Sequence, residues 1–134
     1  MSGHTILHPP GWPRPRGYAN GVAATGRTVF TAGVIGWTAE EKIEAPDFAG
    51  QFRQILLNTL AILAEAGAGP EHIVRMTWYI TDRDEYLAAG REIGAIYREL
   101  LGRTFPAMAV VIVAGLIERA ARLEIETTAV VPGL

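Results

Sequence analysis

Residues 103–116, RTFPAMAVVIVAGL, are the feature that most constrains the fold of this chain. The run carries its only charge at Arg103 and has no hydrophilic side chain after Thr104. Because successive side chains of a strand point to opposite faces, a strand formed here is apolar on both faces. Each of those faces must therefore be covered by something other than solvent.

The composition suits one globular domain that spans residues 1–134, since 49% of the 134 residues are hydrophobic and 19% are charged. Residues 1–16 hold four prolines and are expected to form an extended, Pro-rich arm. The absence of cysteine excludes disulfides and thiolate chemistry. The N-terminus resembles no signal peptide and no apolar run could span a membrane, so we expect a cytoplasmic protein without a membrane partner.

The residues after the arm predict alternating strands and helices. Apolar residues at helical spacing predict one helix over 47–67 and a second from Asp82 or Asp84 to Gly102. Strands are predicted at 27–36, 72–81, 103–116 and 121–131, with 21–25 as a short strand paired to 27–36 through a turn at 25–26. This order favours an α/β (α+β) fold, a two-layer domain with both helices on one face of a single mixed sheet.

The helices of such a domain cover only one face of the sheet. The predicted strands at 72–81 and 103–116 keep apolar residues on the other face, where they would expose a larger patch than a monomer usually carries. Copies of the same chain are the simplest cover for that patch. We therefore expect an obligate homo-oligomer, with clefts for a small molecule where subunits meet.

Several kinds of chemistry are excluded by residue type. The only serine is Ser2, in the arm, which leaves no Ser-His-Asp triad. The three histidines show no metal-ligand spacing and no phosphate-binding or dinucleotide motif is present, so neither a metal nor a cofactor is expected. A net charge of -2 and a pI of about 5.9 argue against a nucleic-acid partner.

Acid–base chemistry remains open to the Glu, Asp, Tyr and Arg side chains. The segment LEIE places Glu124 and Glu126 on the same side of a strand. Two interpretations stand: the solvated face of an edge strand, or a carboxylate that orients water in an intersubunit cleft. Tyr18, where the arm meets the domain, either packs or donates a hydrogen bond.

Six ordered segments resemble a known family over residues 17–131: RGYANGV, VFTAGVIG, FAGQFRQILLNTLAIL, IVRMTWYITDRDEY, FPAMAVV and LEIETTAV. They are similar to those of the RidA/YjgF family, the reactive-intermediate (enamine/imine) deaminases. The resemblance implies a chorismate-mutase-like fold, a homotrimer and a site at each subunit interface.

The resemblance also implies site residues, with departures from the family pattern. Tyr18 matches the family's tyrosine, Glu124 matches its water-binding glutamate, and the backbone of Gly33 is kept. Met108 stands where deaminating members carry the arginine that clasps the substrate carboxylate, and a thioether cannot form those charge-assisted bonds. Gly90 stands in place of an asparagine. The chain is thus similar to a divergent branch that lacks the carboxylate-binding arginine.

The function implied by this resemblance is hydrolysis of an enamine or imine to a carbonyl compound and ammonia, with Glu124 as the catalytic residue. The expected substrate-binding residues are Tyr18, Arg16, Gly33, Trp37, Phe105, Ala107 and Met108. The larger side chains among them favour a flat substrate such as a 2-aminomuconate-type unsaturated amino acid, whose carboxylate would meet Arg16. Two alternatives remain open: a trimer that binds a small metabolite without catalysis and, less favoured by the charge, an endoribonuclease.

Overall fold

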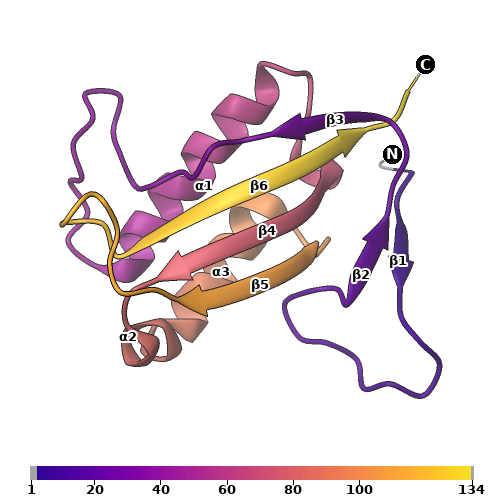
Figure 1. The fold of residues 1–134 in the computed structure, drawn as a ribbon, viewed down its shortest axis with the longest axis horizontal. Coiled ribbons are helices and arrows are strands. Elements are labelled where there is room, and N and C mark those ends of the chain that lie inside the picture. The colour runs from indigo at the N-terminus through magenta and orange to yellow at the C-terminus, as the bar shows by residue number, and fades with distance from the viewer. Residues whose placement is uncertain (1–2, 134) are drawn as a thin grey trace.

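The apolar run 103–116 contains the edge strand β5 (Ala107–Ile112) of a four-stranded mixed sheet. The computed structural model describes residues 3–133, so Ser2 lies outside the described residues, and it orders the sheet β3-β6-β4-β5 (Figure 1). β4 (Ile73–Ile80) pairs in parallel with β5. β6 (Leu123–Val131) pairs antiparallel with β4 and with β3 (Arg27–Phe30). The predicted mixed sheet is confirmed, although β3 ends earlier than the strand predicted at 27–36.

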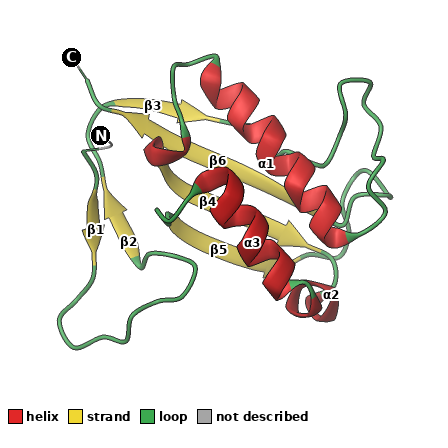
Figure 2. Ribbon diagram, turned by 180° about the vertical axis from the view of Figure 1, so that it is seen from behind, coloured by secondary structure: helices red, strands yellow, loops and turns green. Residues whose placement is uncertain are grey.

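The first helix, α1 (Phe48–Ala64), forms where the apolar spacing predicts it. The side chain of Asp47 accepts a hydrogen bond from the backbone N–H of Gly50 at 3.0 Å, which satisfies one of the free donors of the first turn. Gly67, at φ 70°, turns the chain away after the helix. A single 3₁₀ turn, η1 (Pro70–His72), then leads into β4. Figure 2 shows the helices on one face of the sheet, as predicted.

The second predicted helix is broken into α2 (Arg83–Ala88) and α3 (Gly90–Leu101). Asp82 caps α2 by accepting from the N–H groups of Asp84 and Glu85. Ala89 departs from helical geometry with a ψ of 5°, and the glycine that follows it holds the helical conformation poorly. The continuous apolar stripe expected over this region is therefore interrupted, and Leu87 is 64% exposed.

The arm is paired differently from the prediction. β1 (Thr5–Leu7) and β2 (Gly21–Ala23) form a separate antiparallel two-stranded sheet, so the expected hairpin between 21–25 and 27–36 is wrong. Gly26, at φ 150°, forms a corner between β2 and β3, and the position requires glycine because a Cβ there would collide with the Val131 carbonyl. β3 consequently leaves this corner along β6, while β2 turns back to the start of the chain.

The face of the sheet beneath the helices carries the main core. Neighbouring strands align their inward residues, so that Met76 pairs with Met108, and Trp78 pairs with Ile125. Phe52 of α1 is fully buried and its ring lies 4.8 Å from that of Trp78. This layer of side chains packs the helices against the sheet. It includes the apolar helix residues whose spacing predicted a buried face.

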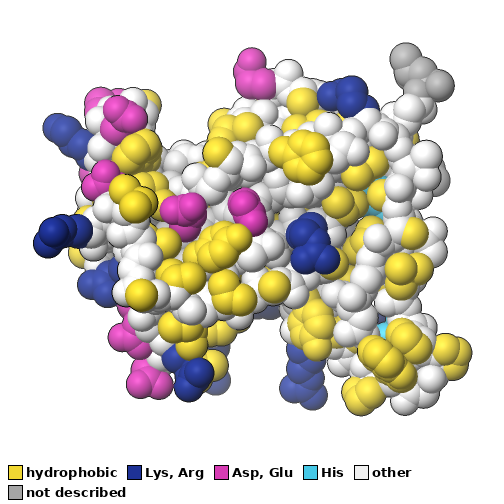
Figure 3. All heavy atoms as spheres, viewed as in Figure 1, with side chains coloured by type: hydrophobic (Ala, Val, Ile, Leu, Met, Phe, Trp, Pro, Cys, Tyr) yellow, Lys and Arg dark blue, Asp and Glu magenta, His cyan; other side chains and the backbone are white. Residues whose placement is uncertain are grey.

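The opposite face, which we call the open face, carries no helix and is presented to the viewer in Figure 3. Alternation places Arg75, Thr77 and Tyr79 of β4 on it, so this strand brings polar groups as well as an aromatic ring to the open face. β5 does present apolar side chains there, and Val111 is 40% exposed. Acidic, basic and apolar side chains therefore lie side by side on this face (Figure 3).

Candidate functional site

The largest group of candidate residues meets in a cavity of about 610 Å³ on the helix side of the sheet. Its walls come from the arm, from β4 and β5, and from α2 and α3. Four residues expected to bind substrate line it: Arg16, Tyr18, Phe105 and Met108. The volume falls within the range of small-molecule sites, roughly 300–1,000 Å³.

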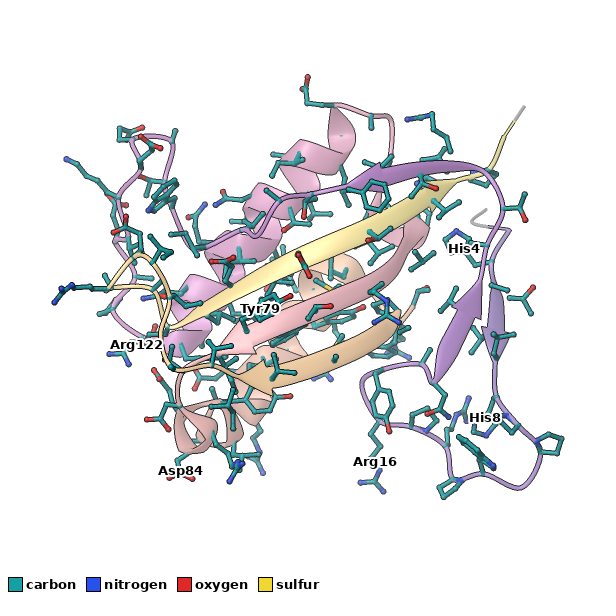
Figure 4. All side chains as sticks on the ribbon, viewed as in Figure 1. His4, His8, Arg16, Tyr79, Asp84 and Arg122 are labelled. Carbon is teal, nitrogen blue, oxygen red and sulfur yellow. The ribbon has the colours of Figure 1, made fainter. Side chains whose placement is uncertain are left out.

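The arm is fixed to the mouth of this cavity by its contact with β5. The backbone N–H of Ala19 donates to the carbonyl of Pro106 at 2.9 Å, and Ala19 forms a β-bridge with Ala107. Tyr18 is thereby held beside the start of β5, and Arg16 extends from the same loop (Figure 4). Ala107 itself is buried and does not line the cavity, because it pairs with Arg75 and its side chain lies on the opposite face of the sheet.

Aromatic rings form much of the cavity wall. Tyr97 and Phe105 stack with centroids 4.9 Å apart, and Trp78 meets Tyr86 edge to face at 6.0 Å. The Tyr97 hydroxyl donates to the carbonyl of Thr104 at 2.8 Å, and burial raises the pKa of this phenol well above its usual range. The phenol therefore stays neutral at physiological pH and serves as a fixed part of the wall.

Glu124 lies elsewhere, on the open face. A side chain at position 33 would collide with the Glu124 carboxylate, so Gly33 allows the carboxylate to lie against the main chain. Within residues 3–133 this carboxylate accepts no hydrogen bond and forms no ion pair. Its oxygens are therefore available to an acid–base partner or to water.

Tyr79 and Glu126 flank Glu124 on the open face. The Tyr79 hydroxyl donates to Oε1 of Glu126 at 2.7 Å, and Figure 4 shows Tyr79 over the middle of the sheet. This hydrogen bond is the chief reason why the pKa of Tyr79 is raised; desolvation and the charges of Glu126 and Glu124 act in the same direction. Glu126 is thus engaged where Glu124 is free, which distinguishes the two carboxylates that the sequence left equivalent.

A single chain does not bring Met108 and Glu124 together. Met108 pairs with Met76 and points toward the helices, whereas Glu124 pairs with Tyr79 and points away from them. Trp37 also lies apart, in the loop between β3 and α1, where it bridges to Ile43 and does not line the cavity. The expected site residues therefore form two groups on opposite faces of the sheet.

Most of the other residues that line the cavity were not identified in the sequence as candidates, Trp78, Tyr86 and Arg98 among them. No set of three or more His, Asp or Glu side chains within residues 3–133 is arranged to hold a metal ion.

None of the helices formed by the described residues has the length and apolar character needed to cross a bilayer.

Residues 13–131 match the family model described as Endoribonuclease L-PSP. A RutC family protein of Synechocystis is 32% identical over 122 residues, which cover 90% of this chain and 91% of the relative. A protein of Dermatophagoides farinae named 2-iminobutanoate/2-iminopropanoate deaminase is 29% identical over 133 residues, or 98% of this chain and 99% of the relative.

Solved structures show the same architecture. YyfB of Yersinia pestis, described as a protein of unknown function of the conserved Rid family, superposes with a TM-score of 0.83 at 28% identity and covers 96% of this chain and 99% of its own. Escherichia coli TdcF with bound serine gives a TM-score of 0.69 at 32% identity, with coverage of 94% and 98%.

The fold is a small mixed α+β domain. Its candidate site residues lie in two places, the helix-side cavity and the open face of the sheet. The family model covers nearly the whole of the domain. The chain belongs to the RidA/YjgF family, as the six sequence segments implied.

Proposed function

We propose that this chain is a divergent RidA-like deaminase that hydrolyses an enamine or imine to a carbonyl compound and ammonia. The observation that carries the proposal is the division of groups between the two faces. The helix-side cavity has no Asp or Glu among the described residues that line it, and Glu124 on the open face has no partner. Each face thus offers what the other lacks.

The two groups meet if the open face of one subunit packs beside the cavity of the next, as in a homotrimer with one site at each interface. The exposed apolar residues of the open face, Phe30 and Val111 among them, favour such packing because association would remove them from water. The site would then combine Tyr18 and Met108 of one subunit with Glu124 of its neighbour.

In the proposed reaction a water molecule adds to the carbon of a protonated C=N bond, and Glu124 accepts the proton that the water loses. The nitrogen of the resulting carbinolamine is protonated and leaves as ammonia, while its hydroxyl oxygen becomes the carbonyl oxygen. One imine and one water thus give one carbonyl compound and one ammonia. Backbone N–H groups near Gly33 and Ala107 are the candidates to hold a substrate oxygen.

The substrate class proposed is an unsaturated amino acid of the 2-aminomuconate type, larger than a two- or three-carbon imino acid. Phe105 and Met108 line an apolar cavity that accommodates a flat body, and Arg16 lies at its rim as a partner for a carboxylate. The name of the mite relative, 2-iminobutanoate/2-iminopropanoate deaminase, supports the reaction type for this family.

One observation favours a second candidate, a trimer that binds a small metabolite without catalysis. Met108 places a thioether, which binds carboxylates poorly, in the cavity wall. An endoribonuclease, the activity in the name of the family model, is less well supported, because the open face presents the carboxylates of Glu124 and Glu126 and the net charge is -2.

The proposal is tested by ammonia release from 2-iminopropanoate and from 2-aminomuconate, each generated enzymatically in the presence of the pure protein. We expect release from the larger substrate, and Glu124→Gln should abolish it because the amide keeps the shape but accepts no proton. Glu126→Gln is the matched control, since its amide oxygen can still accept from Tyr79. Equal loss in both variants, or no release by the unmodified protein, would contradict the proposal.

A further inference from the structure

The helix-side cavity offers hydrogen-bond donors and cationic groups but no anion. Among the described residues that line it are two guanidinium groups, Arg16 from the arm and Arg98 from α3, and no Asp or Glu. Neither guanidinium forms a hydrogen bond or an ion pair within residues 3–133. Both residues are exposed, so their charge meets solvent and no acid of the described residues.

Arg98 resembles Arg83 and Arg91, which also form no ion pair among the described residues, and differs from Arg53 and Arg122. Arg53 of α1 pairs with Glu99 at 2.6 Å, and Arg122 pairs with Glu85 at 2.8 Å. Glu99, the acid next to Arg98 in sequence, is thus already occupied by another helix. Arg98 is left as a free cation on a rigid element, whereas Arg16 lies on the loop of the arm.

The Arg98 guanidinium lies beside Gly94, a glycine of α3 that also lines the cavity. Gly94 precedes it by one turn on the same face, and Nη1 of Arg98 lies 3.4 Å from the position that a Cβ would take at Gly94. That distance is ordinary van der Waals contact, so a methyl group at position 94 would fit beside the guanidinium. Gly90, one turn earlier, also lines the cavity, and a Cβ there would meet nothing within 4 Å.

Trp78 has a buried donor without an acceptor among residues 3–133. It lines the cavity and is only 2% exposed, yet its indole N–H is buried without a hydrogen-bond partner in the part of the chain that the structure describes. Buried donors are nearly always satisfied in native proteins. The nitrogen itself is closed to solvent, so a ligand oxygen would reach it only after the surrounding side chains moved.

The remaining wall is apolar and largely flat. The stacked rings of Tyr97 and Phe105 lie with Met108 and Val110 along one side. A thioether packs well against aromatic rings and is a poor neighbour for charge. A ligand that complements this cavity has a planar apolar body and a negatively charged oxygen at one end.

We propose that this cavity binds an aromatic carboxylate, with Arg98 as the residue that holds the carboxylate and with the ring seated against Phe105 and Met108. The inference rests on the proposed function only for the reacting group; it replaces the 2-aminomuconate-type substrate with an aromatic 2-imino acid, and Arg16 with Arg98 as the partner of the carboxylate. Binding of a stable carboxylate requires no turnover, so it can be tested separately from catalysis.

The test is isothermal titration calorimetry of the full chain with three probes. 3-Phenylpropanoate has both the ring and the charge, 3-phenylpropan-1-ol has the ring alone, and propanoate has the charge alone. We expect the aromatic acid to bind at least about tenfold more tightly than either of the others, the effect of one charge-assisted contact. Equal affinity for the aromatic acid and the alcohol would overturn the inference.

Substitutions locate the anchor. Arg98→Gln should remove the tenfold preference for the acid and leave the affinity for the alcohol unchanged, and Arg98→Lys should restore part of it. Arg16→Gln is the matched control, with a smaller effect expected. A preference that survives Arg98→Gln but is lost in Arg16→Gln would overturn the assignment of Arg98.

Gly90→Leu tests the cavity itself. The leucine side chain should fill the space and prevent binding of both aromatic probes, while thermal stability holds or rises because leucine is a better helix former than glycine. Unchanged binding by a folded Gly90→Leu protein would overturn the placement of the ligand. If the aromatic acid binds but no imine is hydrolysed, the proposed function fails and this inference stands. If an imine is hydrolysed while the aromatic acid neither binds nor inhibits, this inference fails and the proposed function stands.

Discussion

The two faces of the sheet are built from alternate residues of the same strands and serve different ends. On the helix-covered face, Met76 and Trp78 of β4 are buried in the core. On the open face, Thr77 and Tyr79 of the same strand lie beside the carboxylates of β6. One face contains the contacts that a single chain needs in order to fold, and the other contains polar groups and apolar surface that the chain does not cover itself.

Residues that determine the stability of the single chain therefore lie mainly on the covered face, and residues proposed for association and chemistry lie mainly on the open face. A substitution on the covered face changes packing inside one chain, so its cost is set by cavity and transfer terms. A substitution on the open face changes association or chemistry and leaves the monomer's core intact. The predictions below test this difference between the covered side and the open face, from the largest expected effect to the smallest.

Phe52→Ala should lower the free energy of unfolding by about 3–5 kcal/mol, because it empties a fully buried site against Trp78. Phe30→Ala removes the same side chain from the open face, where the ring is 73% exposed, and should change the stability of the single chain by less than about 0.5 kcal/mol. Chemical denaturation at two protein concentrations checks both values. A Phe30→Ala effect that depends on protein concentration would show that copies bury this residue.

Val111→Asp should dissociate the proposed trimer while leaving a folded chain. The side chain faces the open side of β5, and an unpaired carboxylate enclosed between subunits costs several kcal/mol. Ile117→Asp is the control, since Ile117 is 99% exposed in a loop away from the sheet. Sedimentation equilibrium with circular dichroism distinguishes dissociation from unfolding. A trimer that survives Val111→Asp would mean that the open face is not the interface.

Tyr97→Phe should lower the free energy of unfolding by about 0.5–1.5 kcal/mol, because it leaves the Thr104 carbonyl without its donor. Tyr79→Phe loses a hydrogen bond to Glu126 at an exposed site and should leave stability unchanged. The reverse order, with Tyr79→Phe the more costly, would contradict the comparison of the two faces.

The comparison of the unmodified protein with Tyr97→Phe also predicts how the free energy of unfolding depends on pH. Burial raises the pKa of Tyr97 in the folded state, so the unfolded chain releases this proton first, near pH ~10. The contribution of the protonated Tyr97 phenol to the free energy of unfolding is fully present below that pH. It is lost as the pH rises toward the folded-state pKa. Stability curves measured from pH 8 to 11 should therefore fall for the unmodified protein and fall less for Tyr97→Phe.

Much of the fold could be predicted because it depends on local patterns. The spacing of apolar residues and the Asp47 cap gave α1 nearly to its ends, and alternation placed Glu124 and Glu126 on one face. The break after Ala88 was missed because an isolated glycine does not by itself end a helical pattern. The pairing of β2 was wrong because its partner, Thr5–Leu7, lies far away in sequence, while a nearer strand offered an obvious turn.

The site was less predictable, for a related reason. Whether Met108 shares a face with Glu124 depends on the register of β5 and β6 against β4, which no single segment specifies. Trp78 resembles any core residue of an apolar strand, and Arg98 resembles any solvated helix residue. Only the packing of α3 over the sheet shows that these side chains line one cavity.

The smallest predicted effect is a gain in stability at Thr127. This residue pairs with Met76 on the covered face, is 2% exposed, and buries a hydroxyl oxygen without a hydrogen-bond partner among residues 3–133. A buried hydroxyl left unsatisfied is costly, so Thr127→Val, which keeps the shape, should raise the free energy of unfolding by about 0.5–1 kcal/mol. Thr128→Val, one position along on the open face, removes a hydroxyl that is half-exposed and should leave the unfolding free energy of the chain unchanged. Denaturation of both variants in parallel gives the comparison, and a loss of stability at Thr127 would mean that its hydroxyl finds a partner, such as a buried water, which valine cannot replace.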